Sequence, residues 1–151
     1  MTDSNAPLNS LTLIGYSDAM AAISAGASIA KERGVALSFA VLDAAGHLVA
    51  SARMDGAPFI TVEVARGKAF ACAATGGVPG AALAQRFRDN PMIWGNTAAL
   101  GYGAPMLPAQ GALPIRRQGV LIGAMAASGA PSDIDEAVVA QAIAAIGGES
   151  R

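Results

Sequence analysis

The sequence predicts a single α+β domain in which helices pack on an antiparallel sheet. Two pairs of short segments alternate apolar and polar residues around tight turns, which is typical of β-hairpins. Helical periodicity, with apolar residues three or four apart, surrounds each pair. A chain of 151 residues corresponds to one domain and can bury a core without disulfides or metals. Hairpins pair antiparallel and helices cover the sheet, so this order of elements gives the fold class.

The N-terminal part is expected to contain a leader and one helix. Residues 1–10 are polar and predict a flexible leader, followed by a domain over 11–148. Apolar residues at helical spacing predict a helix over 16–33. Gly34 suits the C-cap of this helix, since glycine adopts a left-handed conformation without strain.

A hairpin and a second helix follow. Alternation over 37–41 predicts a half-buried strand, and residues 43–46 supply turn chemistry. The returning strand is expected over 47–54. Pro58 suits the first turn of a helix, and apolar spacing extends that helix over 59–74.

The second half of the chain places a further hairpin between helices. A short helix is expected over 80–90, while the segment 90–107 lacks a clean period and is interpreted as a loop. Clean alternation predicts a second hairpin from strands at 113–118 and 119–127. A capping box that begins at Ser132 (Ser-Asp-Ile-Asp) then predicts the start of the last helix.

The composition is apolar for a protein of this size. Hydrophobic residues make up 53% and charged residues 14% of the chain, against a usual charged share of about 25%. Charged side chains normally cover the surface of a small monomer, so a low share indicates that other subunits cover part of it. We therefore expect a homo-oligomer.

Charge and cysteine content exclude several classes of partner. The net charge is −1 and no stripe of lysine and arginine is present, so no nucleic-acid partner is expected. The single cysteine, Cys72, cannot form an intrachain disulfide and fits a reducing compartment. Residues 1–10 lack the pattern of a signal peptide, and no apolar run approaches the length of a membrane span. We expect a cytoplasmic protein with no membrane partner.

Ionisable residues gather where the first hairpin passes into the second helix. Arg53 and Asp55 share one face of the predicted strand. Arg53 can hold a carboxylate through its planar fork, with Asp55 as a base or an orienting group. A structural ion pair is the alternative. Lys68, on the helix, can bind an anion or act as a reactive amine if desolvated, whereas the alternative is a surface lysine or a partner for Glu63.

We predict that Arg53, Asp55 and Lys68 act as the catalytic or ligand-holding group for an anionic or carboxylated ligand. Lys68 lies two to three turns into the helix, so a neighbouring subunit is expected to complete the site. Glu63 and Arg66 are three residues apart and offer a helix-surface ion pair.

A set of short motifs runs through most of the chain in a fixed order. They are Asp43-x-x-Gly46, Leu48-Val49, Arg53-Met-Asp-Gly-Ala57, Lys68-Ala69, Leu113-Pro-Ile115, Gly119-Val-Leu-Ile-Gly123, Ser128-Gly129 and Asp135-Glu136. The set resembles the signature of the GlcG/HbpS family, the haem-degrading domain family, over residues 11–146. This resemblance implies a profilin-like fold, with a five-stranded antiparallel sheet flanked by helices, and assembly into homo-oligomers.

Members of that family differ in function, and a fold does not imply a chemistry. They include extracellular haem-binding proteins, the haem-binding C-terminal domain of a cobalamin adenosyltransferase, proteins of the glycolate operon, and lyases for hydroxylaminobenzoate. The sequence departs from the family pattern at Ala112, where a glycine is usual, and at 126–127, where a Gly-Val pair is usual. A methyl group at position 112 is expected to narrow a backbone approach to ligand.

The resemblance makes haem a possible cofactor, and few residues of this sequence can serve as an axial ligand of its iron. His47 is the only histidine, so a multi-histidine metal site is excluded and no metal site is expected. An axial haem ligand would be His47, Met54, Met92, Cys72 or Tyr102. A solvated histidine at the mouth of the hairpin is the alternative for His47, and a small core residue is the alternative for Cys72.

Aromatic and amide residues in the segment 90–107 are further candidates. Trp94, Asn96 and Tyr102 can line a pocket for a planar ligand, or Trp94 can fill an oligomer interface instead. Two functions follow. The first is a binding protein for haem or another planar carboxylated molecule. The second is a cofactor-independent lyase or hydrolase for a small aromatic acid, and a purely structural role needs no pocket. The sequence leaves open whether the protein is an enzyme.

Overall fold

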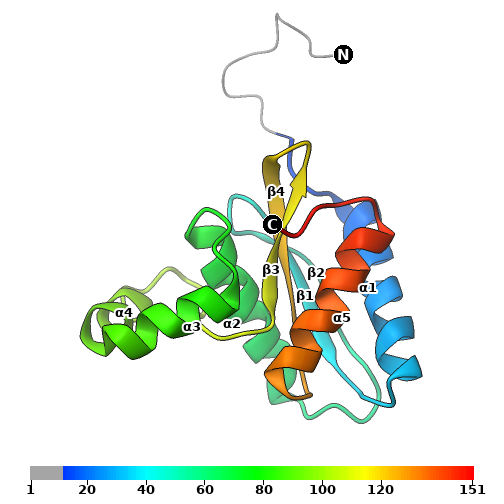
Figure 1. Ribbon diagram of the computed structural model, residues 1–151, viewed down its shortest axis with the longest axis horizontal. Helices are drawn as coiled ribbons and strands as arrows, with labels where there is room; N and C mark the ends of the chain where they lie inside the picture. Colours follow the sequence, from blue (N-terminus) through cyan, green and yellow to red (C-terminus); the bar gives the residue numbers. More distant parts are fainter. Residues whose placement is uncertain (1–11) are drawn as a thin grey trace, which may run out of the picture.

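The computed structural model describes residues 12–151 and contains one α+β domain (Figure 1). Its elements are α1 (Tyr16–Glu32), β1 (Ser38–Asp43), β2 (Leu48–Arg53), α2 (Ile60–Ala74), α3 (Gly80–Asp89), α4 (Pro91–Ala98), β3 (Ala112–Arg117), β4 (Val120–Ser128) and α5 (Ser132–Ala145). Both predicted hairpins and the predicted helices are confirmed. The expected leader at 1–10 lies outside the described residues.

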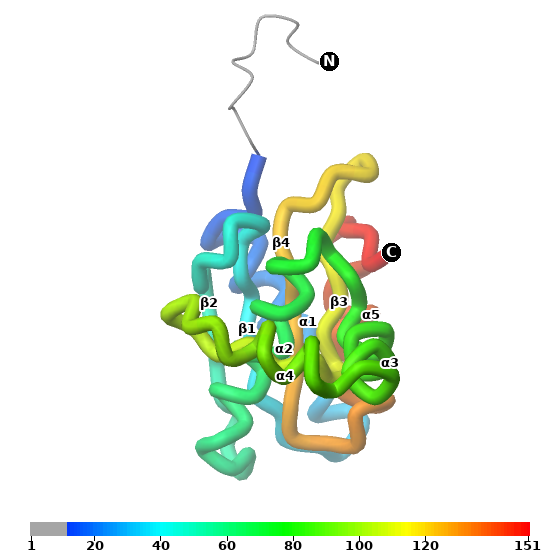
Figure 2. Tube along the Cα trace, turned by 90° about the vertical axis from the view of Figure 1, so that its left-hand side faces the viewer, coloured from blue at the N-terminus to red at the C-terminus, as the bar shows by residue number. Residues whose placement is uncertain are grey.

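The four strands form one antiparallel sheet in the order β2-β1-β4-β3. Figure 2 shows the strands side by side in this order. β1 pairs with β2 on one side and with β4 on the other, from Ser38 opposite Ser128 to Asp43 opposite Gly123. Its first five residues are buried on both faces. The expectation of a half-buried strand is therefore wrong. The alternation in this strand is between large and small apolar residues, and both faces of the strand are covered.

The family resemblance implies a five-stranded sheet, and this expectation is wrong. The described residues form four strands. Residues 99–111, which precede β3, contain two prolines and three glycines with positive φ. Their long-range backbone bonds are single, from the N–H of Leu107 to Gly67 and from the N–H of Ala127 to Gly111, so they form no strand. The outer edge of β3 instead carries a single antiparallel bridge, between Arg116 and Glu149. The backbone groups of these two residues exchange hydrogen bonds of 2.7 and 2.8 Å, which shields part of the edge without adding a strand.

Helices cover both faces of the sheet, which gives three layers (Figure 1). α1 and α5 pack on one face with the larger core residues, including Phe39, Val41 and Met125. Gly26 of α1 sits directly over Phe39, where an added Cβ would lie 2.8 Å from the ring. Only glycine lets α1 approach the sheet this closely.

The opposite face, under α2, is built almost entirely from small residues. Alanines of the helix and the strands form this cluster with Leu42 and Cys72. Ala112 belongs to it and is fully buried against α2, so its methyl group fills the core and not a ligand approach. Small side chains on both surfaces let α2 pack close to the sheet.

Two local expectations are corrected. The segment interpreted as a loop contains α4, which begins with Pro91 at a position where no backbone N–H is needed. α4 has no buried residue, so it leaves no apolar period in the sequence. With α3 it forms an arm that projects from the α2 side of the domain (Figure 1). The capping box is also absent, because Ser132 makes no side-chain cap and Pro131 occupies the N-cap position without an N–H to donate.

Candidate functional site

α2 positions the two cationic groups that matter most in this domain. Arg66 and Phe70 are four residues apart and lie on the same side of the helix. Lys68 is two residues from each, about 200° around the axis at 3.6 residues per turn. The same helix therefore directs Arg66 and Lys68 to different surroundings.

Lys68 is buried in a closed polar contact. Its Nζ donates to the backbone oxygen of Ala127 at 3.2 Å and lies 3.3 Å from Oδ2 of Asp135 on α5. Asp135 is 1% exposed, and its Oδ1 accepts a hydrogen bond from the N–H of Ala130 at 3.1 Å. We call this contact the Lys68–Asp135 pair. It joins the helices on opposite faces of the sheet beyond the end of β4.

The surroundings of the Lys68–Asp135 pair set both its charge and its geometry. Burial raises the pKa of Asp135, while the Lys68 charge and the Ala130 N–H oppose that rise. Gly111, at φ +126°, leaves the space that Lys68 occupies, since an added Cβ would lie 2.8 Å from Nζ. Each charged group in this contact has partners within the chain.

A second polar contact lies at the same end of the sheet. The hydroxyls of Ser38 and Thr61 lie 2.7 Å apart in a buried hydrogen bond, and Thr61 also donates to the oxygen of Pro58 at 2.6 Å. These bonds fix the start of α2 against β1. This end of the domain is therefore internally satisfied.

A different arrangement lies at the mouth of the β1–β2 hairpin. A cavity of about 360 Å³ is lined there by the hairpin turn from Ala45 to Leu48, by Arg66 and Phe70 of α2, and by residues 102–104. We call it the hairpin-mouth pocket. It brings together two residues predicted as ligand-binding, His47 and Tyr102.

The turn that carries His47 is held by Asp43. Oδ1 of Asp43 accepts hydrogen bonds from the N–H groups of Ala45 and His47, both at 3.0 Å. Its Oδ2 lies 3.7 Å from Nδ1 of the His47 ring, whose side chain is 81% exposed. The carboxylate therefore fixes the backbone of the turn that carries His47 and lies beside one ring nitrogen, beyond hydrogen-bond distance.

Two aromatic rings form one wall of the pocket. The centroids of Phe70 and Tyr102 lie 5.6 Å apart with the rings tilted by 47°, an arrangement that aromatic pairs favour. Gly46, at φ +91°, passes close beneath Phe70, and an added Cβ would lie 3.3 Å from its ring. A planar ligand can therefore pack against an aromatic surface next to His47.

The remaining wall carries an unsatisfied cation. Nε of Arg66 is buried and has no hydrogen-bond partner among residues 12–151. The predicted ion pair between Glu63 and Arg66 is wrong for this part of the chain, because Arg66 forms none of the ion pairs found there. Glu63 is exposed, and Arg66 turns instead to the pocket that it lines.

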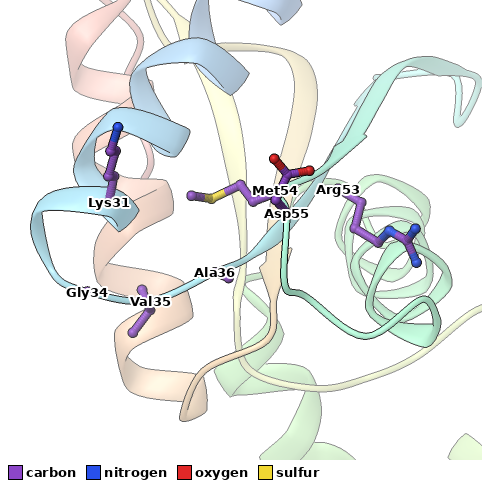
Figure 3. Close-up of a pocket in the computed structure, with 7 residues that line it drawn as sticks. All are labelled: Lys31, Gly34, Val35, Ala36, Arg53, Met54 and Asp55. Carbon is purple, nitrogen blue, oxygen red and sulfur yellow. The ribbon is translucent and has the colours of Figure 1, made fainter.

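Arg53, Met54 and Asp55 lie in another place. They line a cavity of about 630 Å³ together with Lys31 and backbone at the end of α1 (Figure 3). Figure 3 shows the Arg53 side chain directed away from Met54 and Lys31. Lys68 does not line this cavity, so one chain does not bring the predicted group of Arg53, Asp55 and Lys68 together in a single cavity. Their joint role, with a second subunit completing the site, stays a prediction.

The other candidates are dispersed. Trp94, on α4, is half-buried against the cluster of Ala71, Leu83 and Met106, with the Arg86 guanidinium 6.0 Å from its ring centroid. Asn96 is exposed, Met92 is 76% exposed, and neither lines the hairpin-mouth pocket. Cys72 is fully buried, and burial raises the pKa of its thiol to about 12. A buried thiol of this kind behaves as a small core residue.

Sequence reasoning missed Arg66 and Phe70 as pocket residues and Asp135 as the partner of Lys68. The spacing of Arg66 and Phe70 placed them on one helix side, but no pattern in the sequence showed which element would face that side. Among residues 12–151, no group of three or more His, Cys, Asp and Glu side chains could hold a metal ion. None of the helices in that range is long and apolar enough to cross a membrane.

Comparison with known proteins assigns the family. The family model described as "Haem degrading protein HbpS-like" matches residues 14–144. The chain belongs to this family. The resemblance recognised in the motifs is thereby confirmed, whereas no curated protein matches the chain.

Solved structures of HbpS-like proteins share the fold over nearly the whole chain. HbpS is 27% identical with a TM-score of 0.79 and covers 95% of this chain and 97% of its own. A double mutant of Streptomyces reticuli HbpS is 26% identical with a TM-score of 0.79 and covers 95% and 94%. The PduOC:Heme complex, at 23% identity and a TM-score of 0.81, covers 93% and 99% and shows the fold alone. None of these relatives supports the lyase or hydrolase alternative.

Proposed function

We propose that this protein binds a small molecule, namely haem or another planar carboxylated molecule, in the hairpin-mouth pocket. The observation that carries the proposal is the convergence, in one cavity, of the only histidine, an aromatic pair and an arginine whose Nε has no hydrogen-bond partner among residues 12–151. Membership of the HbpS-like family supports haem as the ligand. The likeness to HbpS and to a protein crystallised with haem is consistent with it.

The residues present fit haem. Haem, when bound, would supply an iron that accepts an imidazole or phenolate ligand, and His47 and Tyr102 both line the pocket. Asp43 holds the backbone of His47 and lies near its Nδ1, where carboxylates often stand beside metal-bound histidines. A cavity of about 360 Å³ is near the lower limit for ligand sites, which span about 300–1,000 Å³. A small aromatic acid fits within it, and the larger haem extends beyond its rim.

The assembly and location predicted from the sequence belong to the same proposal. We propose a cytoplasmic homo-oligomer with a profilin-like fold. Exposed apolar side chains on the arm support this assembly, because another subunit would cover them. Met92, Ile93 and Leu100 are 76%, 57% and 71% exposed. Light scattering is expected to give a multiple of the 15.0 kDa chain mass at micromolar concentration, and the mass of one chain would contradict this.

A hemin titration tests the function. We expect the wild-type protein to shift and sharpen the Soret band with saturable, weak binding, because one oriented imidazole is available. His47→Ala should weaken this binding without abolishing it, since Tyr102, Phe70 and Arg66 remain. A spectrum unchanged by the wild-type protein would overturn haem as the ligand. A tight complex lost entirely in His47→Ala would show that a single axial ligand dominates.

A further inference from the structure

We infer that Arg66 is the carboxylate anchor of the hairpin-mouth pocket, so that the pocket selects a planar ring carrying a carboxylate. This inference rests on the proposed function, because that function places the ligand in this pocket. It goes beyond that function in two ways. It assigns a role to Arg66, which lies outside the motifs by which the family was recognised, and it requires a carboxylate on the ligand. The experiment below separates its failure from that of the proposed function.

The Arg66 guanidinium has a buried donor without a partner among the described residues. Its Nε is the one buried side-chain nitrogen or oxygen of residues 12–151 without a hydrogen-bond partner. Buried donors in folded proteins nearly always have a partner, and an exception indicates an unfilled role. Two arginines in the same range do have partners, since Arg117 bonds to Asp18 at 3.2 Å and Arg116 to the oxygen of Gly76.

The position of Arg66 relative to the aromatic wall supports the same inference. Arg66 and Phe70 line the same cavity from successive turns of α2. Residues four apart on a helix are separated by about 6 Å along its axis. That separation suits a ligand whose ring packs on Phe70 and Tyr102 while a carboxylate, attached directly or through a short chain, reaches the guanidinium.

The guanidinium of Arg66 also matches a carboxylate in its chemistry. A guanidinium presents two parallel N–H donors to a carboxylate, which gives both strength and orientation. Among residues 12–151, no second lysine or arginine lines this cavity, so its one guanidinium matches one carboxylate. A propionate of haem and the carboxylate of a small aromatic acid both meet this requirement, and the shared chemistry is a ring with an anionic carboxylate.

The experiment compares carboxylated probes with their neutral counterparts. Hemin is titrated beside its dimethyl ester, and benzoate is titrated beside benzamide, each with the wild-type protein, Arg66→Gln and Arg66→Lys. Hemin binding is followed by the Soret band, and benzoate binding by calorimetry. Arg88→Gln is the matched control, because Arg88 is an exposed arginine of α3 that bonds only to Gln85 among the described residues. Circular dichroism checks that each variant is folded.

We expect Arg66→Gln to weaken the binding of a carboxylated probe by roughly ten- to hundredfold, as for the loss of a charge-assisted hydrogen bond. Arg66→Lys should weaken it less, and Arg88→Gln should not change it. Wild-type protein should prefer each acid to its neutral counterpart by a similar factor, and Arg66→Gln should lose that preference. Because the ester and amide arms use the wild-type protein, they test the inference even if the variants unfold.

The two failures can be told apart. If hemin or benzoate binds wild type and Arg66→Gln equally, or binds no better than its neutral counterpart, the inference is overturned and the proposed function stands. If benzoate alone binds and depends on Arg66, the inference stands and haem is excluded as the ligand. If neither acid binds the wild-type protein, both are overturned.

Discussion

Two cations of α2, Arg66 and Lys68, are two residues apart and have opposite surroundings. Lys68 is 5% exposed and has two partners, the oxygen of Ala127 and the carboxylate of Asp135. Arg66 has a buried Nε without a hydrogen-bond partner in the described part of the chain and lines a cavity. Both residues belong to the same helix and to the same stretch of sequence. Their different surroundings therefore arise from the other elements that pack against each side of α2.

The comparison teaches that burial of a charge does not by itself mark a site. The Lys68–Asp135 pair is complete within the chain, and such pairs fix how elements pack. The hairpin-mouth pocket differs, because Nε of its arginine has no hydrogen-bond partner among residues 12–151. We therefore assign Lys68 to the architecture of the domain and Arg66 to its ligand, and the predictions below test this division.

The largest effect is expected from Lys68→Met. It leaves Asp135 buried without its cation and should lower the free energy of unfolding by about 3–5 kcal/mol, the usual result of breaking a buried pair. The loss should be smaller at acidic pH. Burial already raises the pKa of Asp135 above 3.8, and loss of Lys68 raises it further. A raised folded-state pKa means that stability is full below the unfolded value and is lost as pH rises. Urea unfolding at pH 5 and pH 7.5 measures both effects.

A double variant provides the control for Lys68→Met. Lys68→Met combined with Asp135→Leu removes both charges and should recover most of the lost stability, because apolar side chains of similar volume often replace buried pairs at no loss. A single variant as stable as wild type would show that the Lys68–Asp135 pair does not hold the layers together.

Gly111→Ala should give the next largest effect. A side chain at φ +126° is strained, and the new Cβ would lie 2.8 Å from Nζ of Lys68 and 3.0 Å from the oxygen of Ala127. We expect a loss of about 1–3 kcal/mol from the backbone alone, with a further loss from displacing Lys68. Gly34→Ala is the matched control, since its φ is +72° and no atom lies within 4 Å of its added Cβ. If Gly111→Ala is no more costly in the presence of Lys68 than in Lys68→Met, the two residues are not coupled.

At the other end of the comparison, Asp43→Ala tests how the pocket is held. It removes both turn hydrogen bonds and the carboxylate beside the His47 ring, so hemin affinity should fall by about tenfold, as for an outer-shell partner of a metal ligand. Asp43→Asn keeps an acceptor for the N–H groups of Ala45 and His47 but lacks the charge beside Nδ1. It should lie between wild type and Asp43→Ala in a Soret titration. Equal affinity in all three proteins would mean that His47 needs no orientation.

The smallest effect is expected at Cys72, a third polar group of α2. Burial raises the pKa of its thiol to about 12, so about one molecule in 10⁴ carries a thiolate at pH 8. A thiol reagent should therefore react only after unfolding in urea, and hemin affinity should be the same before and after exposure of the folded protein to the reagent. Rapid labelling of the folded protein would place Cys72 beside an open surface.

The elements of this fold follow from local patterns in the sequence. Alternation gave both hairpins, and helical spacing gave α1, α2 and α5, because each pattern reports the burial of one face by its neighbours. α4 escaped this reasoning since it has no buried residue, and the segment 90–107 was interpreted as a loop although Pro91 begins a helix there. The fifth strand came from the family resemblance and is absent from residues 12–151.

The candidate site was only partly accessible from the sequence. His47 and Tyr102 were predicted as ligand residues, and the structure places both in one pocket. Their meeting depends on the loop after α4, whose path no local pattern fixes. Lys68 and Asp135 are 67 residues apart, and only the three-layer packing brings them to 3.3 Å. The same packing turned Arg66 away from Glu63, the neighbour that spacing alone suggested.

A paramagnetic titration tests the division between pocket and architecture most directly. Ferric haem broadens the amide signals of nearby residues, and zinc protoporphyrin serves as the diamagnetic control. The hairpin turn and the start of α5 lie at opposite ends of β1 and β4, about 17 Å apart at about 3.3 Å per residue. We predict that hemin broadens the amides of Gly46, His47 and Gly103 and spares those of Gly129 and Asp135. Broadening at Gly129 and Asp135, with His47 unaffected, would place the ligand beside Lys68 and contradict the account.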